Sequence, residues 1–201
     1  MKLIAVTDNK MPTKQLIETL LGIEPYIDAV ILREKSKTDG EMHDLLQTLV
    51  DSGFNRLKIM VHGRADIASL SKIGKVQLPG HGVPLPLVKE YFPNLSFGRS
   101  VHSFREAEIA INEGADWLLY GHLFTTNSKE GLPPRGIKEL YRITASTTIP
   151  VYAIGGIKPE HLPRLQQTGI SGVAVMSSIF GSNHSVQAAQ AYKEGRYVKP
   201  R

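Results

Sequence analysis

The stretch VYAIGGIKPEHLPRLQQTGISGVAVMSS, residues 151–178, contains one full repeat of the pattern that decides the fold. An apolar run at 151–156 ends in two glycines, a segment with helical signals follows at 158–170, and a second apolar run at 172–178 ends in two serines. Such near-continuous runs of Val, Ile and Ala are typical of strands that are covered on both faces, as in a parallel sheet. The stretch therefore predicts two parallel strands joined by a helix.

The same alternation extends toward the N-terminus. Between two of the runs, Ser103 with Glu106 three residues later predicts a helix start, and Gly114 predicts its end. The apolar runs occupy residues 3–8, 29–34, 58–62, 75–79, 95–102, 117–122, 151–156 and 172–178. Eight such units in 201 residues predict a single-domain (β/α)8 TIM barrel over residues 1–201 rather than an open sheet.

The composition excludes several kinds of protein. The chain has no cysteine, which rules out disulfides, thiolate nucleophiles and zinc sites built on cysteine. Its net charge of +5 favours anionic ligands, but the basic residues form no long run, so we do not expect nucleic-acid binding. There is no apolar run of membrane-spanning length and no signal-like N-terminal segment. We therefore expect a cytoplasmic protein that does not enter a membrane.

The loops after the seventh and eighth runs predict a phosphate site. Active sites of such barrels lie where the strands end, and these two loops are their recurring phosphate site. Gly155 and Gly156 allow close backbone approach, while Met176, Ser177 and Ser178 begin a short helical turn whose N–H groups favour an anion. The alternative interpretation is a pair of ordinary tight turns.

The sixth run, WLLYGH (117–122), ends in His122 and is followed by a long polar loop at 123–135 that contains Lys129. Histidine exchanges protons near neutral pH and is the commonest general acid or base. A lone histidine on an apolar strand is often a core residue with satisfied hydrogen bonds. Because His122 falls at the end of its strand, we predict that it is catalytic.

Other polar residues end the remaining runs. For each of them the alternative interpretation is a solvated surface group or a helix cap. Gln77 is expected to face the barrel mouth. We predict substrate contacts for Arg33, Lys35, His62, Gln77 and Ser100, in addition to Lys129 and the residues of the phosphate site. Runs three to six end without Asp or Glu, so the sequence predicts no metal site and no cofactor.

Six ordered motifs give the chain a resemblance to a known family. They are ILREK (31–35), HGRADIA (62–68), GRSVHS (98–103), GADWLLYGHLFTTNSKEG (114–131), PVYAIGGI (150–157) and GVAVMSSIF (172–180). Together they resemble the thiamin phosphate synthase superfamily over nearly the whole chain. Within it, the chain is most similar to the TenI-type thiazole tautomerases.

The departures from the synthase pattern favour the tautomerase branch. Synthases carry Asn-Asp where this chain has His62-Gly63, an acid in the fourth loop where it has PGHG (79–82), and Gly-Pro where it has Gly121-His122. The first two substitutions remove the acids associated with magnesium, and His122 matches the position proposed for the tautomerase acid/base.

The resemblance thus implies an isomerase that converts a phosphate-bearing thiazole carboxylate into its aromatic tautomer. It also implies a homodimer. The alternatives are a thiamin phosphate synthase-like transferase and a non-catalytic, regulatory ligand-binding barrel.

Overall fold

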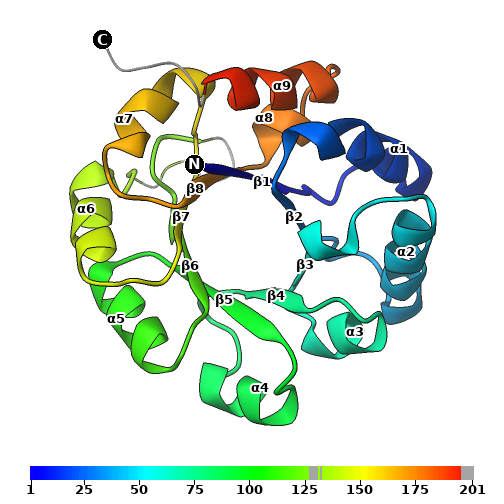
Figure 1. Ribbon diagram of the computed structural model, residues 1–201, viewed down its shortest axis with the longest axis horizontal. Helices are drawn as coiled ribbons and strands as arrows, with labels where there is room; N and C mark the ends of the chain where they lie inside the picture. The colour runs from blue at the N-terminus through cyan, green and yellow to red at the C-terminus, as the bar shows by residue number, and fades with distance from the viewer. Residues whose placement is uncertain (127–130, 132, 196–201) are drawn as a thin grey trace.

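The computed structural model describes residues 1–126, 131 and 133–195, and its strands form one closed barrel (Figure 1). Each strand pairs in parallel with the next along the chain, and β1 closes the barrel by pairing with β8. The strands are β1 Lys2–Val6, β2 Ala29–Leu32, β3 Ile59–His62, β4 Lys75–Leu78, β5 Ser96–Val101, β6 Trp117–Gly121, β7 Val151–Ile154 and β8 Gly172–Val175. The predicted (β/α)8 barrel is confirmed.

The helices form a ring around the outside of the strands (Figure 1). They are α1 Thr13–Ile23, α2 Asp39–Asp51, α3 Ala65–Leu70, α4 Leu85–Tyr91, α5 Phe104–Asn112, α6 Ile137–Ala145, α7 Leu162–Gln166, α8 Ser177–Phe180 and α9 Ser185–Gly195, with 3-10 turns at Glu24–Tyr26, Arg56–Lys58 and Pro159–His161. The first and last helices, α1 and α9, lie side by side and complete the ring. None of the helices in the described ranges is long and apolar enough to cross a membrane.

The start of α5 follows the local rule expected from sequence. The Ser103 hydroxyl accepts a hydrogen bond from the Glu106 N–H at 3.1 Å, and Gly114 takes a φ of +84° just after the helix ends. The Glu106 carboxylate accepts from the N–H of His102 at 2.8 Å, one residue before the position that a capping box would use. This bond ties the end of β5 to the helix that follows it.

Two apolar layers hold the barrel together. One lies between the strands and the surrounding helices and contains most of the buried residues. The other fills the barrel interior and consists of Ile4, Val6, Ala29, Ile31, Met60, Trp117, Leu119, Tyr152 and Ala174. Because this inner layer fills the barrel interior, a ligand site is expected at the carboxyl-terminal strand ends above it.

Candidate active site

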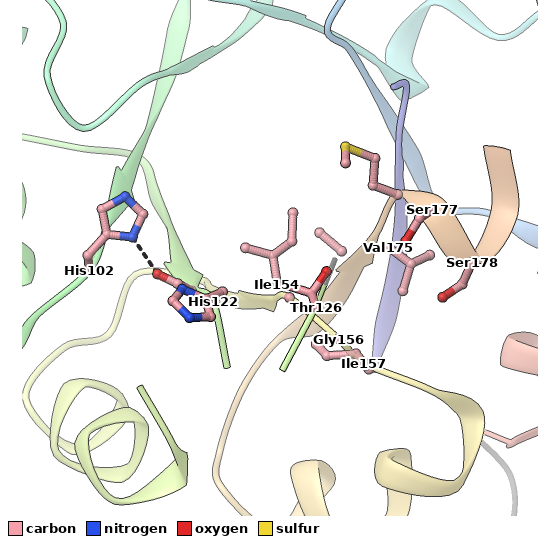
Figure 2. Close-up of a pocket in the computed structure, with 13 residues that line it drawn as sticks. His102, His122, Thr126, Ile154, Gly156, Ile157, Val175, Ser177 and Ser178 are labelled. Atoms are coloured by element: carbon pink, nitrogen blue, oxygen red, sulfur yellow. Dashed lines mark hydrogen bonds between the residues drawn. The ribbon is translucent and has the colours of Figure 1, made fainter. Parts of the chain in front are cut away.

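A cavity of about 160 Å³ opens at the carboxyl-terminal ends of β5 to β8 (Figure 2). Its lining residues are His102, Gly121, His122, Thr126, Ile154, Gly155, Gly156, Ile157, Ala174, Val175, Met176, Ser177 and Ser178. The structure thus brings together His122 and all five residues of the predicted phosphate site. Figure 2 shows His102 and His122 on one side of the cavity, with Ser177 and Ser178 opposite.

His122 is the first residue beyond β6, and its position is fixed by the loops on both sides. It is only 7% exposed. The next residue, Leu123, donates its N–H to the Ile154 carbonyl at 2.9 Å, so the chain after β6 remains paired with β7. The carbonyl of His122 accepts the N–H of Arg135 at 3.0 Å, which joins the two ends of the long loop. The backbone at His122 is therefore held at the cavity wall by main-chain bonds.

The turn at Gly155 and Gly156 needs glycine at both positions. Their φ angles are +107° and +62°, in the region that side chains rarely adopt. A Cβ on Gly155 would lie 2.6 Å from the Cα of His122, and one on Gly156 would lie 2.3 Å from the Thr125 carbonyl oxygen. Both glycines thus allow the β7 turn to pack directly on the chain that carries His122.

The opposite wall is the start of α8. The first N–H groups of a helix have no partner within the helix, and Ser177 and Ser178 occupy those positions. Both serine side chains are exposed, while Met176 before them is half-buried. Backbone amides, rather than buried side chains, are therefore the donors that this wall offers to an anion.

A separate group of predicted residues lies at the ends of β2 and β3. Burial lowers the pKa of His62 to about 4, with further lowering from the nearby charges of Arg33 and Lys35. His62 is consequently neutral at neutral pH, and its surroundings are positive. None of these three residues lines the cavity that contains His122.

Gln77 lies inside the barrel rather than at its mouth. It is 0% exposed, its amide oxygen accepts the Trp117 Nε1–H at 2.8 Å, and its amide nitrogen donates to the Ser100 hydroxyl at 3.1 Å. A fully buried amide with both ends bonded has no free edge for a ligand. Its position lets it orient Ser100, which is half-buried above it. Lys129 lies outside the described residues.

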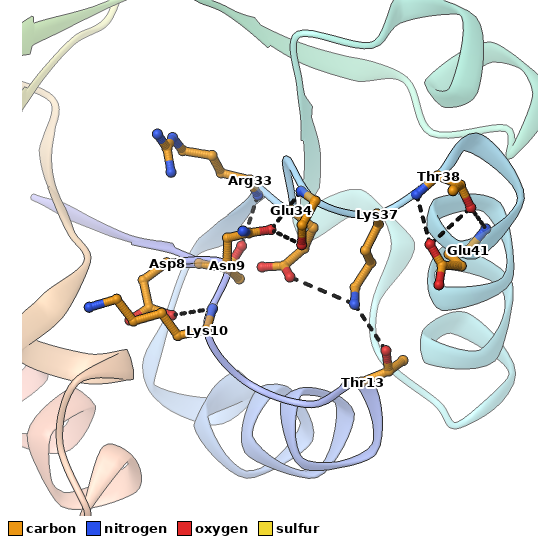
Figure 3. A network of polar contacts seen from close by, with 11 residues as sticks. Asp8, Asn9, Lys10, Thr13, Arg33, Glu34, Lys37, Thr38 and Glu41 are labelled. Carbon is orange, nitrogen blue, oxygen red and sulfur yellow. Dashed lines mark hydrogen bonds and ion pairs between the residues drawn. The ribbon is translucent and has the colours of Figure 1, made fainter.

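The acids at the ends of β1 and β2 belong to a polar network that joins two loops (Figure 3). Glu34, with a side chain only 2% exposed, pairs with Lys37 at 3.9 Å. Lys37 also donates to the Thr13 hydroxyl at 3.0 Å, and the Asp8 carboxylate accepts the Lys10 N–H at 3.2 Å. Within the described residues, no three His, Asp or Glu side chains are grouped as metal ligands.

Sequence reasoning did not select three kinds of residue in the cavity. Ile154, Ile157 and Val175 supply an apolar wall, and Thr126 contributes from the loop after β6. His102 comes from the end of β5, where it is one of several polar residues in the motif GRSVHS (98–103). Its signal is spatial, since its Nδ1 hydrogen-bonds the carbonyl oxygen of Gly121 on the neighbouring strand.

Comparison with solved structures supports the architecture. A thiamine phosphate pyrophosphorylase from Pyrococcus furiosus superposes with a TM-score of 0.84 at 31% identity, covering 97% of this chain and 95% of that chain. A 3-hexulose-6-phosphate synthase superposes with a TM-score of 0.76 at 17% identity, covering 97% of this chain and 99% of that one. At that identity the second likeness supports the fold alone.

Sequence comparison supplies the family. The chain is 32% identical to a thiamine-phosphate synthase from Pyrococcus furiosus, over 96% of this chain and 94% of the relative. It is 34% identical to one from Clostridium perfringens, over 91% of this chain and 90% of the relative. The family model for thiamine monophosphate synthase matches residues 3–179. The chain therefore belongs to the thiamine monophosphate synthase family, an enzyme family of thiamin biosynthesis.

Proposed function

We propose that this chain is a thiazole tautomerase of thiamin biosynthesis that isomerises a phosphate-bearing carboxythiazole. One observation carries the proposal: the buried ring of His122 shares a cavity with the glycine turn after β7 and with the start of α8. A phosphate held by the glycine turn and by the start of α8 leaves the remainder of the ligand beside His122. The arrangement suits proton transfer on a bound phosphate ester.

The phosphate is held mainly by backbone N–H groups. Those at Gly155, Gly156, Met176 and Ser177 are the donors that we assign to it, because the loops after β7 and β8 are the recurrent phosphate site of this architecture. The side chains of Ser177 and Ser178 are exposed at the edge of the cavity and supplement these contacts. The apolar wall suits the ring of the ligand.

The proposed reaction is an isomerisation that needs no other reactant. The C–H bond breaks at the ring carbon that bears the carboxylate, and the electron pair shifts through the ring to the exocyclic double bond. The exocyclic carbon then takes up a proton, and the ring becomes aromatic. His122 is the residue that we assign to this proton transfer.

The carboxylate of the ligand requires a cation, which the described residues of the cavity lining do not supply. No Lys or Arg is among the described residues that line it. We assign this role to Arg33 and Lys35, with Lys129 as a further candidate from sequence. Figure 3 shows the side chain of Arg33 pointing away from the Glu34–Lys37 pair, so it is not used in that network. A guanidinium suits a planar carboxylate and stabilises charge that develops in the transition state.

The second candidate function is thiamine-phosphate synthase, which the names of the relatives favour. A synthase of this family is expected to hold magnesium with carboxylates. At the matching positions this chain has His62-Gly63 and, in the fourth loop, PGHG (79–82). Neither stretch supplies the oxygen ligands that magnesium prefers. The acids at the ends of β1 and β2 are already engaged with neighbouring groups. These residues do not fit the metal.

The two candidates make opposite predictions for the purified protein. A tautomerase converts the carboxythiazole phosphate tautomer to the aromatic thiazole in excess EDTA, which NMR of the ligand follows directly. A synthase forms thiamin phosphate from a pyrimidine pyrophosphate and a thiazole phosphate only when magnesium is present. Synthase turnover without tautomerase turnover would reject the proposal. A protein that binds the thiazole phosphate without either turnover would be a ligand-binding barrel.

Replacement of His122 tests the assigned residue. His122→Asn is expected to lower the single-turnover rate by about 10²–10⁴, the usual contribution of a positioned acid or base. Affinity for inorganic phosphate should change less than about twofold, because the backbone donors of the phosphate site are untouched. The exposed His184 provides the control. A His122→Asn rate equal to that of His184→Asn would show that another group moves the proton.

A further inference from the structure

His102 is the second histidine of the cavity, and no role has so far been assigned to it. It is the first residue beyond β5 and is half-buried. Its ring lines the same cavity as His122. Figure 2 shows the two rings on the same side of the cavity. Any ligand that reaches His122 therefore lies close to a second imidazole.

The hydrogen bond of His102 determines which ring nitrogen carries the proton. Its Nδ1 bonds to the Gly121 carbonyl oxygen (Figure 2). A carbonyl oxygen only accepts, so Nδ1 is the donor. In the neutral ring, Nε2 then carries the lone pair. A backbone acceptor that fixes the tautomer in this way is a common feature of histidines that act as bases or ligands.

The Nε2 edge of His102 is left open. Within residues 1–126, 131 and 133–195, Nε2 makes no hydrogen bond. The neighbouring turn contains Gly80 at this edge, and a Cβ there would lie 3.9 Å from Nε2. That distance is an ordinary van der Waals contact, so the turn borders this edge of the ring without bonding to Nε2. A fixed tautomer whose second nitrogen has no hydrogen-bond partner suits a general base, and His102 lines the ligand cavity.

We propose that His102 is a second proton-transfer residue, an inference that rests on the proposed tautomerase function. The reaction breaks a C–H bond at one carbon and forms one at another, and two imidazoles can serve the two positions. Nε2 of His102 accepts the proton from the ring carbon, and His122 delivers a proton to the exocyclic carbon. His102 then loses its proton to water and His122 regains one, so no proton is gained or lost overall.

Two variants separate this role from a purely structural one. The amide of His102→Asn lies near the position of Nδ1, so it still donates to the Gly121 carbonyl but offers nothing at the position of Nε2. His102→Gln places its amide near the position of Nε2 and loses the donor to Gly121. A proton-transfer role predicts that His102→Asn lowers the single-turnover rate about 10²–10³-fold, with phosphate affinity within about twofold of the parent. A structural role predicts that His102→Asn keeps the rate and only His102→Gln loses it.

The outcomes distinguish this inference from the proposed function. A parent protein with no turnover of the carboxythiazole phosphate refutes the function, and the role of His102 with it. An active parent whose His102→Asn variant is equally active refutes only the role of His102. NMR of ¹⁵N-labelled histidine in the parent needs no variant: Nδ1 should be the protonated nitrogen, and Nε2 should shift when the aromatic carboxythiazole phosphate binds. A proton on Nε2 instead, or an Nε2 signal unmoved by that ligand, overturns the inference.

Discussion

Gly156→Ala tests whether the β7 turn is built around the loop that carries His122. Gly156 has a φ of +62°, and its Cβ would lie 2.3 Å from the Thr125 carbonyl oxygen and 2.9 Å from that of Phe124. Backbone carbonyls cannot rotate away as a side chain can. The new methyl group must therefore push the β6 loop outward, or the turn itself must shift.

The expected cost has two parts, and a control separates them. A left-handed conformation costs about 1–2 kcal/mol for a residue other than glycine. Forcing an extra methyl into a filled space costs typically about 1–3 kcal/mol more. Gly53 has a φ of +96° with no atom within 4 Å of its Cβ position, so Gly53→Ala has only the first cost. Both changes restrict the unfolded chain equally. The difference between the two variants is therefore the cost of the contact with Thr125.

Urea denaturation measures that difference. With a slope of about 2 kcal/mol per molar urea, the contact lowers the midpoint of Gly156→Ala by about 0.5–1.5 M relative to Gly53→Ala. Phosphate affinity should fall in Gly156→Ala alone, because displacement of Thr125 also moves Thr126 at the cavity wall. Equal midpoints for the two variants would show that the turn is not packed on the loop. Lost binding with an unchanged midpoint would mean instead that the methyl group blocks the ligand.

Three further predictions concern other parts of the mouth. The pKa of His62 is lowered from 6.5 to about 4 in the folded protein. As the pH falls, the imidazole is therefore protonated in the unfolded chain before it is protonated in the folded one. The parent should lose about 3 kcal/mol of unfolding free energy between pH 6.5 and pH 4. Urea titrations at both pH values should show this loss in the parent and in the exposed-site control His184→Gln, but not in His62→Gln. Ser177→Ala should bind inorganic phosphate within about twofold of the parent by calorimetry, since its amide remains; a tenfold loss would assign the contact to the hydroxyl. Lys37→Met should lower the unfolding free energy by about 2–3 kcal/mol, because it leaves the Glu34 carboxylate buried and unpaired. Adding Glu34→Gln to this variant should restore part of the lost stability. An unaltered urea midpoint in Lys37→Met would show that the pair is solvated.

The fold was predictable because the signal for each strand is local. A strand covered on both faces must be apolar at nearly every position, so each of the eight runs is recognisable in isolation. The predicted phosphate residues and His122 were found for the same reason, since each directly follows a run. In a parallel barrel all the strand ends meet at one rim, and proximity along the rim follows from chain order.

The rest of the site depends on contacts that no local pattern encodes. Gln77 reads as a polar residue near a strand end, yet its partner is Trp117, forty positions away, and the pair is buried inside the barrel. His102 is one of several polar residues after β5, and only the carbonyl of Gly121 on the next strand distinguishes it. Side-chain direction in a barrel is set by register between strands, which the sequence of either strand alone does not specify.

The barrel mouth has two halves: the cavity at the ends of β5 to β8, and the separate group of residues at the ends of β2 to β4. This division bears on the choice between the two candidate functions. Both need the phosphate loops after β7 and β8, so those loops do not discriminate. The half formed by β2 to β4 does, because a synthase is expected to bind a metal pyrophosphate there, whereas the proposed tautomerase needs only a cation for a carboxylate. This half contains Arg33, Lys35 and a neutral His62, and the buried acid beside them is paired with Lys37. Burial is the main cause of the low pKa of His62, and the charges of Arg33 and Lys35 add to it; an anion bound there offsets those charges and is expected to raise the pKa. NMR titration of His62 with and without the carboxythiazole phosphate therefore reports directly on that half of the site, and an unchanged pKa would place the carboxylate elsewhere.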